Sequence, residues 1–288
     1  MYKRGNVDSI INNNRAGAVI PQEKENKMKN KIIETLIGRG YEAELKTVTK
    51  NNVKLDAVVM GSGTIRPTIY IDSIIENCTD VDKVADRIIE IYESNINPSF
   101  DLDKILSRDF IAEHITIALQ KVSDIDIVKK ATEFEGIEQY LLVQDKDFSY
   151  KLTKQALNTV GIDVTEAWDI AMDNLKAMTV FEPMAKVLAE LSGMPEQMFD
   201  GLPMTVVSNT YKCKGASAIL NKEALQEYAK ANNTDKIYFI PSSIHEGIII
   251  PGTYEKDIDD LTAMVKEVNS AEADEVDQLA DKAYVINL

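Results

Sequence analysis

The stretch Lys236-Ile237-Tyr238-Phe239-Ile240-Pro241-Ser242-Ser243-Ile244-His245-Glu246-Gly247-Ile248-Ile249-Ile250-Pro251 decides the fold of the chain. Its two ends, residues 236–240 and 248–250, are almost continuously apolar, which is typical of strands that are buried on both faces. The proline, the serines and the glycine between them are turn formers, so residues 241–247 are predicted to form an ordered loop. We therefore expect a hairpin at the centre of a sheet.

Outside this hairpin the same order of elements, a hairpin and then a helix, occurs about four times along the chain. This order predicts an α+β fold in which repeated β-hairpin-plus-helix units form two sheets, each covered by helices on one side. Residues 110–122 fit both a helix and a strand, and β-branched residues favour a strand at their end. The expected strands are 41–50, 53–60, 68–71, 137–143, 150–157, 204–208, 216–220, 236–240, 248–250 and 283–286, and the expected helices are 28–37, 81–92, 164–175, 184–191, 221–229 and 258–268.

These units are expected to group into three parts. Residues 1–27 are polar, have no sustained hydrophobic period and are expected to be a disordered extension. Residues 28–135 are expected to form an N-terminal α+β sub-domain, and residues 136–288 a C-terminal one. Met28 opens the first amphipathic helix, so the sequence is compatible with translation from Met1 and from Met28.

The composition excludes several classes of protein. The chain has 288 residues, 44% of them hydrophobic, and a formal net charge of −15, which excludes collagen-like, low-complexity and wholly disordered proteins. The sequence has no run of 18 apolar residues and no secretory leader pattern, so we expect a cytoplasmic protein that does not contact a membrane. Cys78 and Cys213 have no metal or redox spacing and fit a reducing compartment. The oligomeric state does not follow from the sequence.

The charge is distributed unevenly. Residues 1–31 carry a net charge of +4, so the rest of the chain carries −19. Such an excess of acids repels phosphate backbones, and direct binding of nucleic acid is therefore not expected. Residues 255–281 are the most acidic part, with a net charge of −8, and form either an ordinary solvated face or a binding surface for a protein with a basic surface. The candidate binding residues are Asp257, Asp259, Asp260, Glu272, Asp274, Glu275 and Asp277.

The hairpin loop is the main catalytic candidate. The sequence has no phosphate-binding glycine motif, no G-x-S-x-G and no H-E-x-x-H. Ser242, Ser243, His245 and Glu246 bring a hydroxyl, a base and a carboxylate within a few residues. Because neighbouring side chains on a strand point to opposite faces, the alternative is a structural loop in which His245 bonds a backbone carbonyl. His114 is the second of only two histidines, so we expect no metal site and no cofactor.

Cys213 is a second candidate, as a reactive thiol. It lies between Lys212 and Lys214 in a predicted hairpin loop, and nearby ammonium groups favour the thiolate. No histidine is predicted beside it, so an ordinary loop cysteine is the alternative.

The segment from Tyr238 to Pro251 resembles a bacterial family of unknown function. Residues 53–56, 67–71 and 214–220 support the resemblance, which spans about residues 29–288. Gly247 stands where members of that family tend to carry a larger apolar residue. The resemblance implies an accessory protein of gut bacteria and their mobile elements, and it implies no particular reaction. The last hundred residues are also similar to another uncharacterised bacterial family with an analogous proline-then-histidine hairpin.

Two functions from different classes are compatible with these observations. The lack of catalytic motifs and the acidic charge favour a non-enzymatic cytoplasmic accessory protein that binds a basic protein, such as a mobile-element or phage counter-defence factor. The alternative is a hydrolase-like enzyme centred on the loop of Ser242, Ser243, His245 and Glu246. A pocket that converges on His245 would favour the enzyme, and a flat acidic face would favour binding.

Overall fold

The computed structural model describes residues 22–62, 66–95, 101–146, 148–271 and 274–288. The chain divides into two compact units, of which the first comprises residues 1–50 and 54–98 and the second comprises residues 51–53 and 99–288. Each unit has its own apolar core. One cluster of buried side chains draws on residues 28–92, and four clusters draw on residues 102–286.

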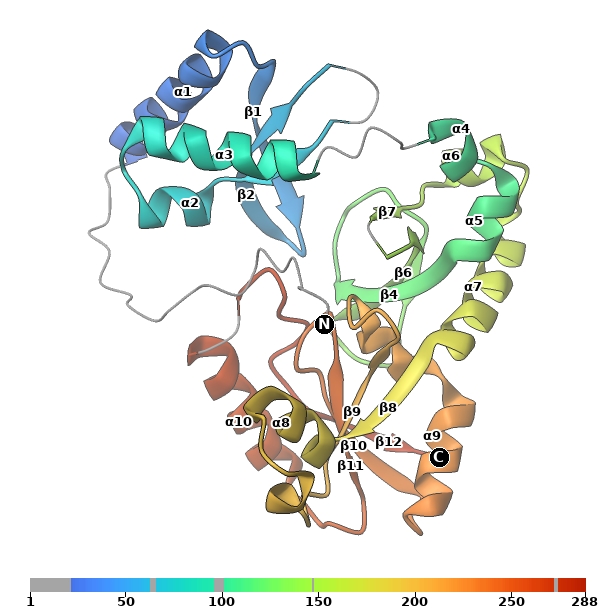
Figure 1. Cartoon of the computed structure of the whole chain (residues 1–288). Coiled ribbons are helices and arrows are strands. Elements are labelled where there is room, and N and C mark those ends of the chain that lie inside the picture. The colour runs from blue at the N-terminus through green and yellow to red at the C-terminus, as the bar shows by residue number, and fades with distance from the viewer. Residues whose placement is uncertain (1–21, 63–65, 96–100, 147, 272–273) are drawn as a thin grey trace. The chain divides into compact units, whose positions relative to one another are not determined.

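The first unit is a three-stranded sheet packed with helices (Figure 1). Ile32 and Leu36 of the first helix and Ile88 of the third pack with Val58 and Met60 of the central strand. This single apolar stripe on each helix fixes which face is buried. The elements are α1 (Gln22–Gly38), β1 (Ala43–Lys50), β2 (Val53–Met60), β3 (Thr68–Tyr70), α2 (Asp72–Asn77) and α3 (Val81–Asn95).

The second unit begins with a four-stranded sheet in the order β4-β6-β5, with β7 paired to β6. One face carries Ile115 and Ile117 of β4 and Leu141 and Val143 of β6, and these pack with the apolar side chains of α5, α6 and α7. The opposite face carries no such helix cluster in the described chain and is partly polar. The elements are α4 (Leu102–Ile105), α5 (Arg108–His114), β4 (Ile115–Lys121), β5 (Lys129–Ala131), β6 (Ile137–Gln144), β7 (Ser149–Lys151), α6 (Lys154–Thr159) and α7 (Val164–Met178).

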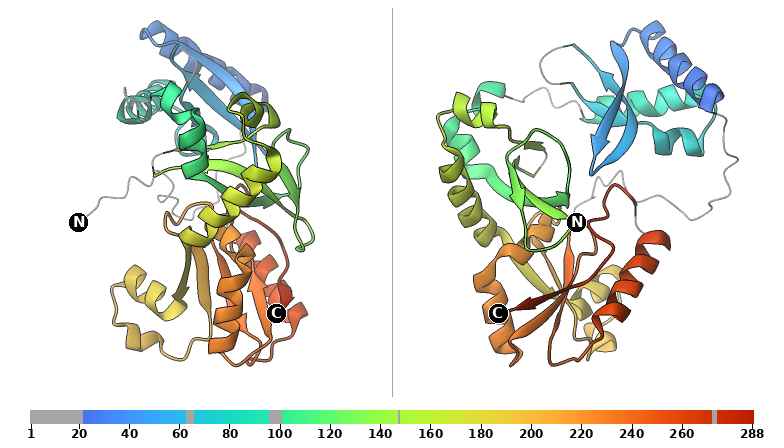
Figure 2. Two further views of the ribbon diagram at one scale, coloured as in Figure 1. Left: turned by 90° about the vertical axis from the view of Figure 1, so that its right-hand side faces the viewer. Right: turned by 180° about the vertical axis from the view of Figure 1, so that it is seen from behind.

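A five-stranded antiparallel sheet follows, in the order β12-β10-β11-β9-β8. The predicted hairpin forms its inner strands β10 and β11. Ile237 and Phe239 of β10 pack with α9, whereas Tyr238 and Ile240 pack with α10, so helices cover both faces and not one as expected (Figure 2). The elements are β8 (Thr179–Pro183), α8 (Met184–Ser192), η1 (Glu196–Phe199), β9 (Thr205–Asn209), η2 (Gly215–Leu220), α9 (Lys222–Ala231), β10 (Lys236–Ile240), β11 (Gly247–Pro251), α10 (Ile258–Ala271) and β12 (Tyr284–Asn287).

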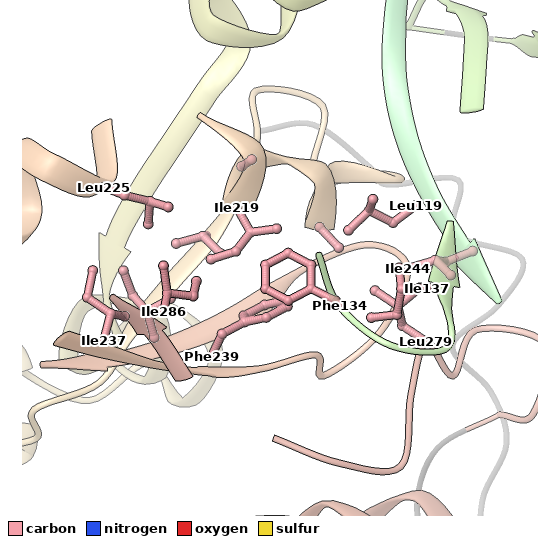
Figure 3. Packing of buried hydrophobic residues seen from close by; sticks show 14 of the residues in the cluster. Leu119, Phe134, Ile137, Ile219, Leu225, Ile237, Phe239, Ile244, Leu279 and Ile286 are labelled. Atoms are coloured by element: carbon pink, nitrogen blue, oxygen red, sulfur yellow. The ribbon is translucent and has the colours of Figure 1, made fainter. Parts of the chain in front are cut away.

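One core cluster anchors two segments that flank the five-stranded sheet. Figure 3 shows Ile244, from the β10–β11 loop, and Leu279, from the segment before β12, at the same end of this cluster as Ile137. Leu279 is fully buried and Ile244 is nearly so. The rings of Phe134 and Phe239 pack at its middle, with 5.1 Å between their centroids. Both segments are therefore anchored to this core cluster by apolar contacts.

The α+β fold is confirmed, and two of the predicted strands are wrong. Residues 216–220 belong to the 3-10 helix η2, which begins at Gly215, because a short buried apolar run fits a helical segment as well as a strand. Of residues 150–157, only the start belongs to β7. The Thr153 side chain accepts a hydrogen bond from the Ala156 N–H and caps α6, and this local cap favours a helix.

Two boundaries also differ from those expected from the sequence, and residues 110–122, which fitted both a helix and a strand, contain both. Helix α1 begins at Gln22, so residues 22–27 are helical where we expected disorder, and residues 1–21 lie outside the described part of the chain. The reason is an ion pair between Glu25 and Lys29, four residues apart, that supports the first turns. The boundary expected after residue 135 lies within the second unit. Residues 110–122 divide between helix α5 and strand β4 at Ile115.

Candidate functional site

The pairing of β9 with β11 brings three distant segments of the second unit together. Val207 is paired with Gly247, so the loop that follows β9 lies beside the loop that precedes β11. The His245 carbonyl accepts hydrogen bonds from the Ser208 hydroxyl (2.8 Å) and from the Gly215 N–H (3.0 Å). The Ile244 N–H donates to the backbone oxygen of Asp277 (2.8 Å). Cys213, His245 and Asp277 meet as a result.

The Cys213 loop is held in a tight conformation. Asn209 closes it, because its side-chain oxygen accepts from the Cys213 N–H (3.3 Å) and its side-chain amide donates to the Cys213 carbonyl (2.9 Å). The Gln144 side chain donates to the same carbonyl (2.8 Å). Lys212 and Lys214 both have φ of 51°, a left-handed conformation that costs a non-glycine residue about 1 kcal/mol. Backbone held in this way is common at functional sites.

The imidazole of His245 contacts three groups. Its Nε2 lies 3.5 Å from Oδ1 of Asp277, and its Nδ1 accepts a hydrogen bond from the Lys214 N–H (3.1 Å). The Cys213 thiol lies close enough to the ring for each group to shift the pKa of the other. The side chains of His245 and Asp277 are 34% and 28% exposed, so the imidazole is packed on one side and open to solvent on the other.

The contacts change the protonation of both the thiol and the imidazole. The hydrogen bonds of Asp277 and Cys213 raise the pKa of His245 to about 9, against the opposing effect of burial. The hydrogen bond of His245 lowers the pKa of the Cys213 thiol, and the Lys214 ammonium acts in the same direction. The Lys214 N–H can donate only to a neutral ring, but one backbone dipole is weaker than two anionic partners. The two pKa shifts favour the thiolate and the imidazolium over the two neutral groups.

The residues of the predicted serine site have other partners. The Ser243 hydroxyl accepts from the N–H groups of His245 (3.0 Å) and Glu246 (3.3 Å) and so closes the loop. Within the described residues, the His245 ring has no hydrogen bond to the hydroxyl of Ser242 or Ser243 or to the carboxylate of Glu246. The alternative in which His245 bonds a backbone carbonyl also differs from what is observed. The ring contacts the Cys213 thiol, the Asp277 carboxylate and the Lys214 N–H.

The candidate acids of the C-terminal segment do not lie on one face. Asp257, Asp259 and Asp260 are exposed at the start of α10, and Oδ1 of Asp257 accepts from the Asp259 N–H (2.8 Å). Asp274 and Glu275 are exposed in the following turn, and Glu272 lies outside the described residues. Asp277 is half-buried against His245 and belongs to the Cys213 site.

The sequence analysis selected Cys213 and His245 separately and missed that they are in contact. They are 32 positions apart, in loops next to β9 and β11, two strands that are neighbours in the sheet but not in the sequence. The signal that could have joined them is that each lies in a polar loop at the end of a strongly apolar strand. Antiparallel pairing of β9 with β11 places those two loops at the same edge.

Other site types were sought in the described ranges. No group of three or more His, Cys, Asp or Glu side chains in these ranges has an arrangement that could hold a metal ion. None of the described helices combines the length and apolar character that crossing a bilayer requires.

Comparison with known proteins gives a family and nothing more specific. A family model described as "Family of unknown function (DUF5688)" matches residues 22–287. Neither the search of curated proteins nor that of solved structures found a match.

Proposed function

The chain belongs to the DUF5688 family, and because that family is one of unknown function, we propose the activity from the site: a hydrolase-like acyl-transfer enzyme with Cys213 as its nucleophile. The observation that carries this proposal is the contact of the Cys213 thiol with a His245 ring that is itself paired to Asp277. A nucleophile bonded to a base, with the base oriented by a third group, is the arrangement that covalent catalysis needs.

The reaction follows from the roles of the three side chains. The Cys213 thiolate attacks the carbonyl carbon of an ester, thioester or amide, and a bond forms between sulfur and carbon. The bond to the leaving group breaks, and the leaving group takes a proton from the His245 imidazolium. The neutral imidazole then removes a proton from water, which attacks the thioester and releases a carboxylic acid and the thiolate. Asp277 holds the ring and stabilises its charged form.

A reduced thiol is a condition of this activity. Disulfide formation removes the nucleophile, and both cysteines are free thiols in the structure. This supports the proposal that the protein works in a reducing compartment such as the cytoplasm.

The test is to trap the acylated cysteine. In the Cys78→Ser variant, Cys213 is the only thiol, and 4-nitrophenyl acetate should release 4-nitrophenol in a burst equal to the protein concentration. Mass spectrometry should place one acetyl group on the peptide that contains Cys213. His245→Gln in the same background should fold, as judged by circular dichroism, and lose the burst. A folded Cys78→Ser protein that gains no acetyl group on Cys213 would overturn the proposal.

Binding of a basic protein is a second candidate, favoured by the exposure of Asp257, Asp259 and Asp260 at the start of α10. Replacing all three by Asn removes the charge and keeps an oxygen that can cap the helix. Association with a basic partner recovered from lysate should slow in this variant, and the difference should shrink as salt is raised above about 0.15 M. Equal association rates of the two proteins at low salt would contradict this candidate. A counter-defence role rests on the same partner.

A further inference from the structure

The Cys213 loop meets a polar face of the four-stranded sheet. Leu142 of β6 is paired with Lys151 of β7, and Gln144 with Ser149, so these side chains share a face with Tyr140. This is the face opposite the helices α5, α6 and α7. The Gln144 side chain donates to the Cys213 carbonyl, which joins the thiol loop to this face.

Two ammonium groups lie along this face, and one of them belongs to Lys214, the residue next to Cys213. Lys214, which follows Cys213, donates from Nζ to the Ser149 hydroxyl (2.6 Å). Lys151, two residues further along the same face of β7, donates from Nζ to the Gln120 side-chain oxygen (2.7 Å). Its Nζ also lies 4.7 Å from the centroid of the Tyr140 ring. Burial raises the pKa of the Tyr140 hydroxyl, and the charge of Cys213 adds to this effect.

The partners of Lys151 do not cancel its charge. Its ammonium group contacts a neutral amide oxygen and a tyrosine ring, and burial and the repulsion of Lys214 and Lys129 lower its pKa. Glu138 attracts it, but one oxygen of that carboxylate already accepts from Gln120, Ser123 and Lys129. An anion bound at this face, in addition to the Glu138 carboxylate, would reduce the repulsion between the ammonium groups of Lys151, Lys214 and Lys129.

We propose that this face is a carboxylate-binding subsite of the Cys213 site, in which Lys151, assisted by Lys214, holds a negatively charged group of the acyl substrate. The inference rests on the proposed function, since it names the substrate class of the same site. The substrate is an acyl compound that carries a carboxylate close to the carbonyl that Cys213 attacks. Lys151 holds the charge of the substrate and takes no part in proton transfer, so it is a binding residue.

A pair of alkylating reagents tests the subsite without requiring the natural substrate. Iodoacetate carries the carboxylate, and iodoacetamide is its neutral counterpart of nearly equal size. Both are followed in the full chain by mass spectrometry, with Cys78 as an internal reference. The ratio of the iodoacetate rate to the iodoacetamide rate should be about tenfold higher at Cys213 than at Cys78, because cations concentrate the anionic reagent.

Variants assign the effect to Lys151. Lys151→Gln should lower the ratio at Cys213 towards that of Cys78 and leave the iodoacetamide rate within about twofold, because the thiolate itself is set by His245. The matched control is Lys154→Gln, an exposed lysine at the start of α6, which should leave the ratio unchanged. In the unmodified chain the ratio should fall as salt is raised, and this measurement does not depend on the variant folding.

The outcomes separate the two proposals. If iodoacetamide modifies Cys213 faster than Cys78 but the ratio is equal at both cysteines and insensitive to salt, the carboxylate subsite is wrong and the nucleophile stands. If neither reagent modifies Cys213 in the folded chain, the nucleophile itself is wrong, and the subsite falls with it.

Discussion

His245 is in contact with three groups that act on its charge in different directions. Asp277 and the Cys213 thiol favour the imidazolium, and the Lys214 N–H favours the neutral ring. The balance lies with the imidazolium, since the pKa of His245 is raised to about 9. A single carboxylate therefore controls the pH range over which the thiolate and imidazolium exist together.

Asp277→Asn should move that range. The His245 pKa should fall by about two units towards the ordinary value of a histidine, because the main cause of its elevation is removed. The side-chain titration is followed by heteronuclear NMR of the imidazole nitrogens, and His114→Gln assigns the two signals. The Ile244 N–H bond to the Asp277 backbone is retained in the variant, so the loop keeps its place. An unchanged His245 titration would show that Asp277 does not act on the ring.

The same shift makes a prediction for stability. A group whose pKa is raised in the folded state stabilises the fold fully below its ordinary pKa, near 6.5, and loses that contribution as the pH rises through about 9. The difference in unfolding free energy between the wild type and Asp277→Asn should therefore be largest below pH 6.5 and vanish above pH 9. Urea unfolding at a series of pH values measures it, and a difference that grows with pH would have the wrong sign.

At the scale of elements, the loop that carries Cys213 depends on a glycine. A Cβ added to Gly215 would lie 2.4 Å from the Asn209 backbone nitrogen and 2.4 Å from the Ser208 hydroxyl. Gly215→Ala should destabilise the fold by about 1–3 kcal/mol and slow alkylation of Cys213, because β9 and η2 must separate. Gly38→Ala is the control, since a Cβ there meets nothing within 4 Å. Urea unfolding and the iodoacetamide rate are the measurements, and equal values for the two variants would contradict the prediction.

Gly247 has a similar constraint with a different neighbour. A Cβ at this position would lie 2.4 Å from the ring of Phe239, so the larger residue expected at this position of the family requires that ring to move. Glycine here allows the close approach of β11 to the Phe239 side chain in the core.

Helix α1 offers a prediction about the first unit. Lys29 is buried and binds Glu25 (2.5 Å), Asp56 (2.7 Å) and Asp72 (3.3 Å). A chain that starts at Met28 loses Glu25 and the first turn, so the first unit should melt at a lower temperature than in a chain that starts at Gln22. Differential scanning calorimetry of the two chains is the test. Equal melting temperatures would show that residues 22–27 do not support the helix.

The sequence predicted elements well where the local signals all favoured the same structure. The helix at 164–178 has an apolar stripe and a capping box at Asp163, and the central strands β10 and β11 have uninterrupted apolar runs. The prediction was wrong at residues 216–220. These residues are almost all buried and have the apolar composition of a buried strand, but they form a 3-10 helix. The site was half predictable, because residue type identifies a thiol and an imidazole, whereas their contact depends on strand order, which no local pattern encodes.

At the scale of the whole molecule, all residues of the candidate site come from the second unit. Its four core clusters use residues 102–286, and the core of the first unit uses residues 28–92. A fragment of residues 99–288 keeps all four clusters and lacks only residues 51–53 of this unit, so it should fold and alkylate at Cys213 with the rate of the full chain. Circular dichroism and the iodoacetamide rate measure this. A folded fragment with a slow thiol would mean that the first unit contributes to the site.

The anchoring of Ile244 and Leu279 in one core cluster has a kinetic consequence. A buried cysteine ordinarily reacts faster when a protein opens, because the sulfur gains access to the reagent. At Cys213 below neutral pH the sign should be reversed. Opening of the segment before β12 carries Asp277 away, opening of the β10–β11 loop carries His245 away, and both return the sulfur to an unreactive thiol. Cys213 is in this sense a built-in reporter of local unfolding, whose labelling slows as the native population falls while that of Cys78 does not.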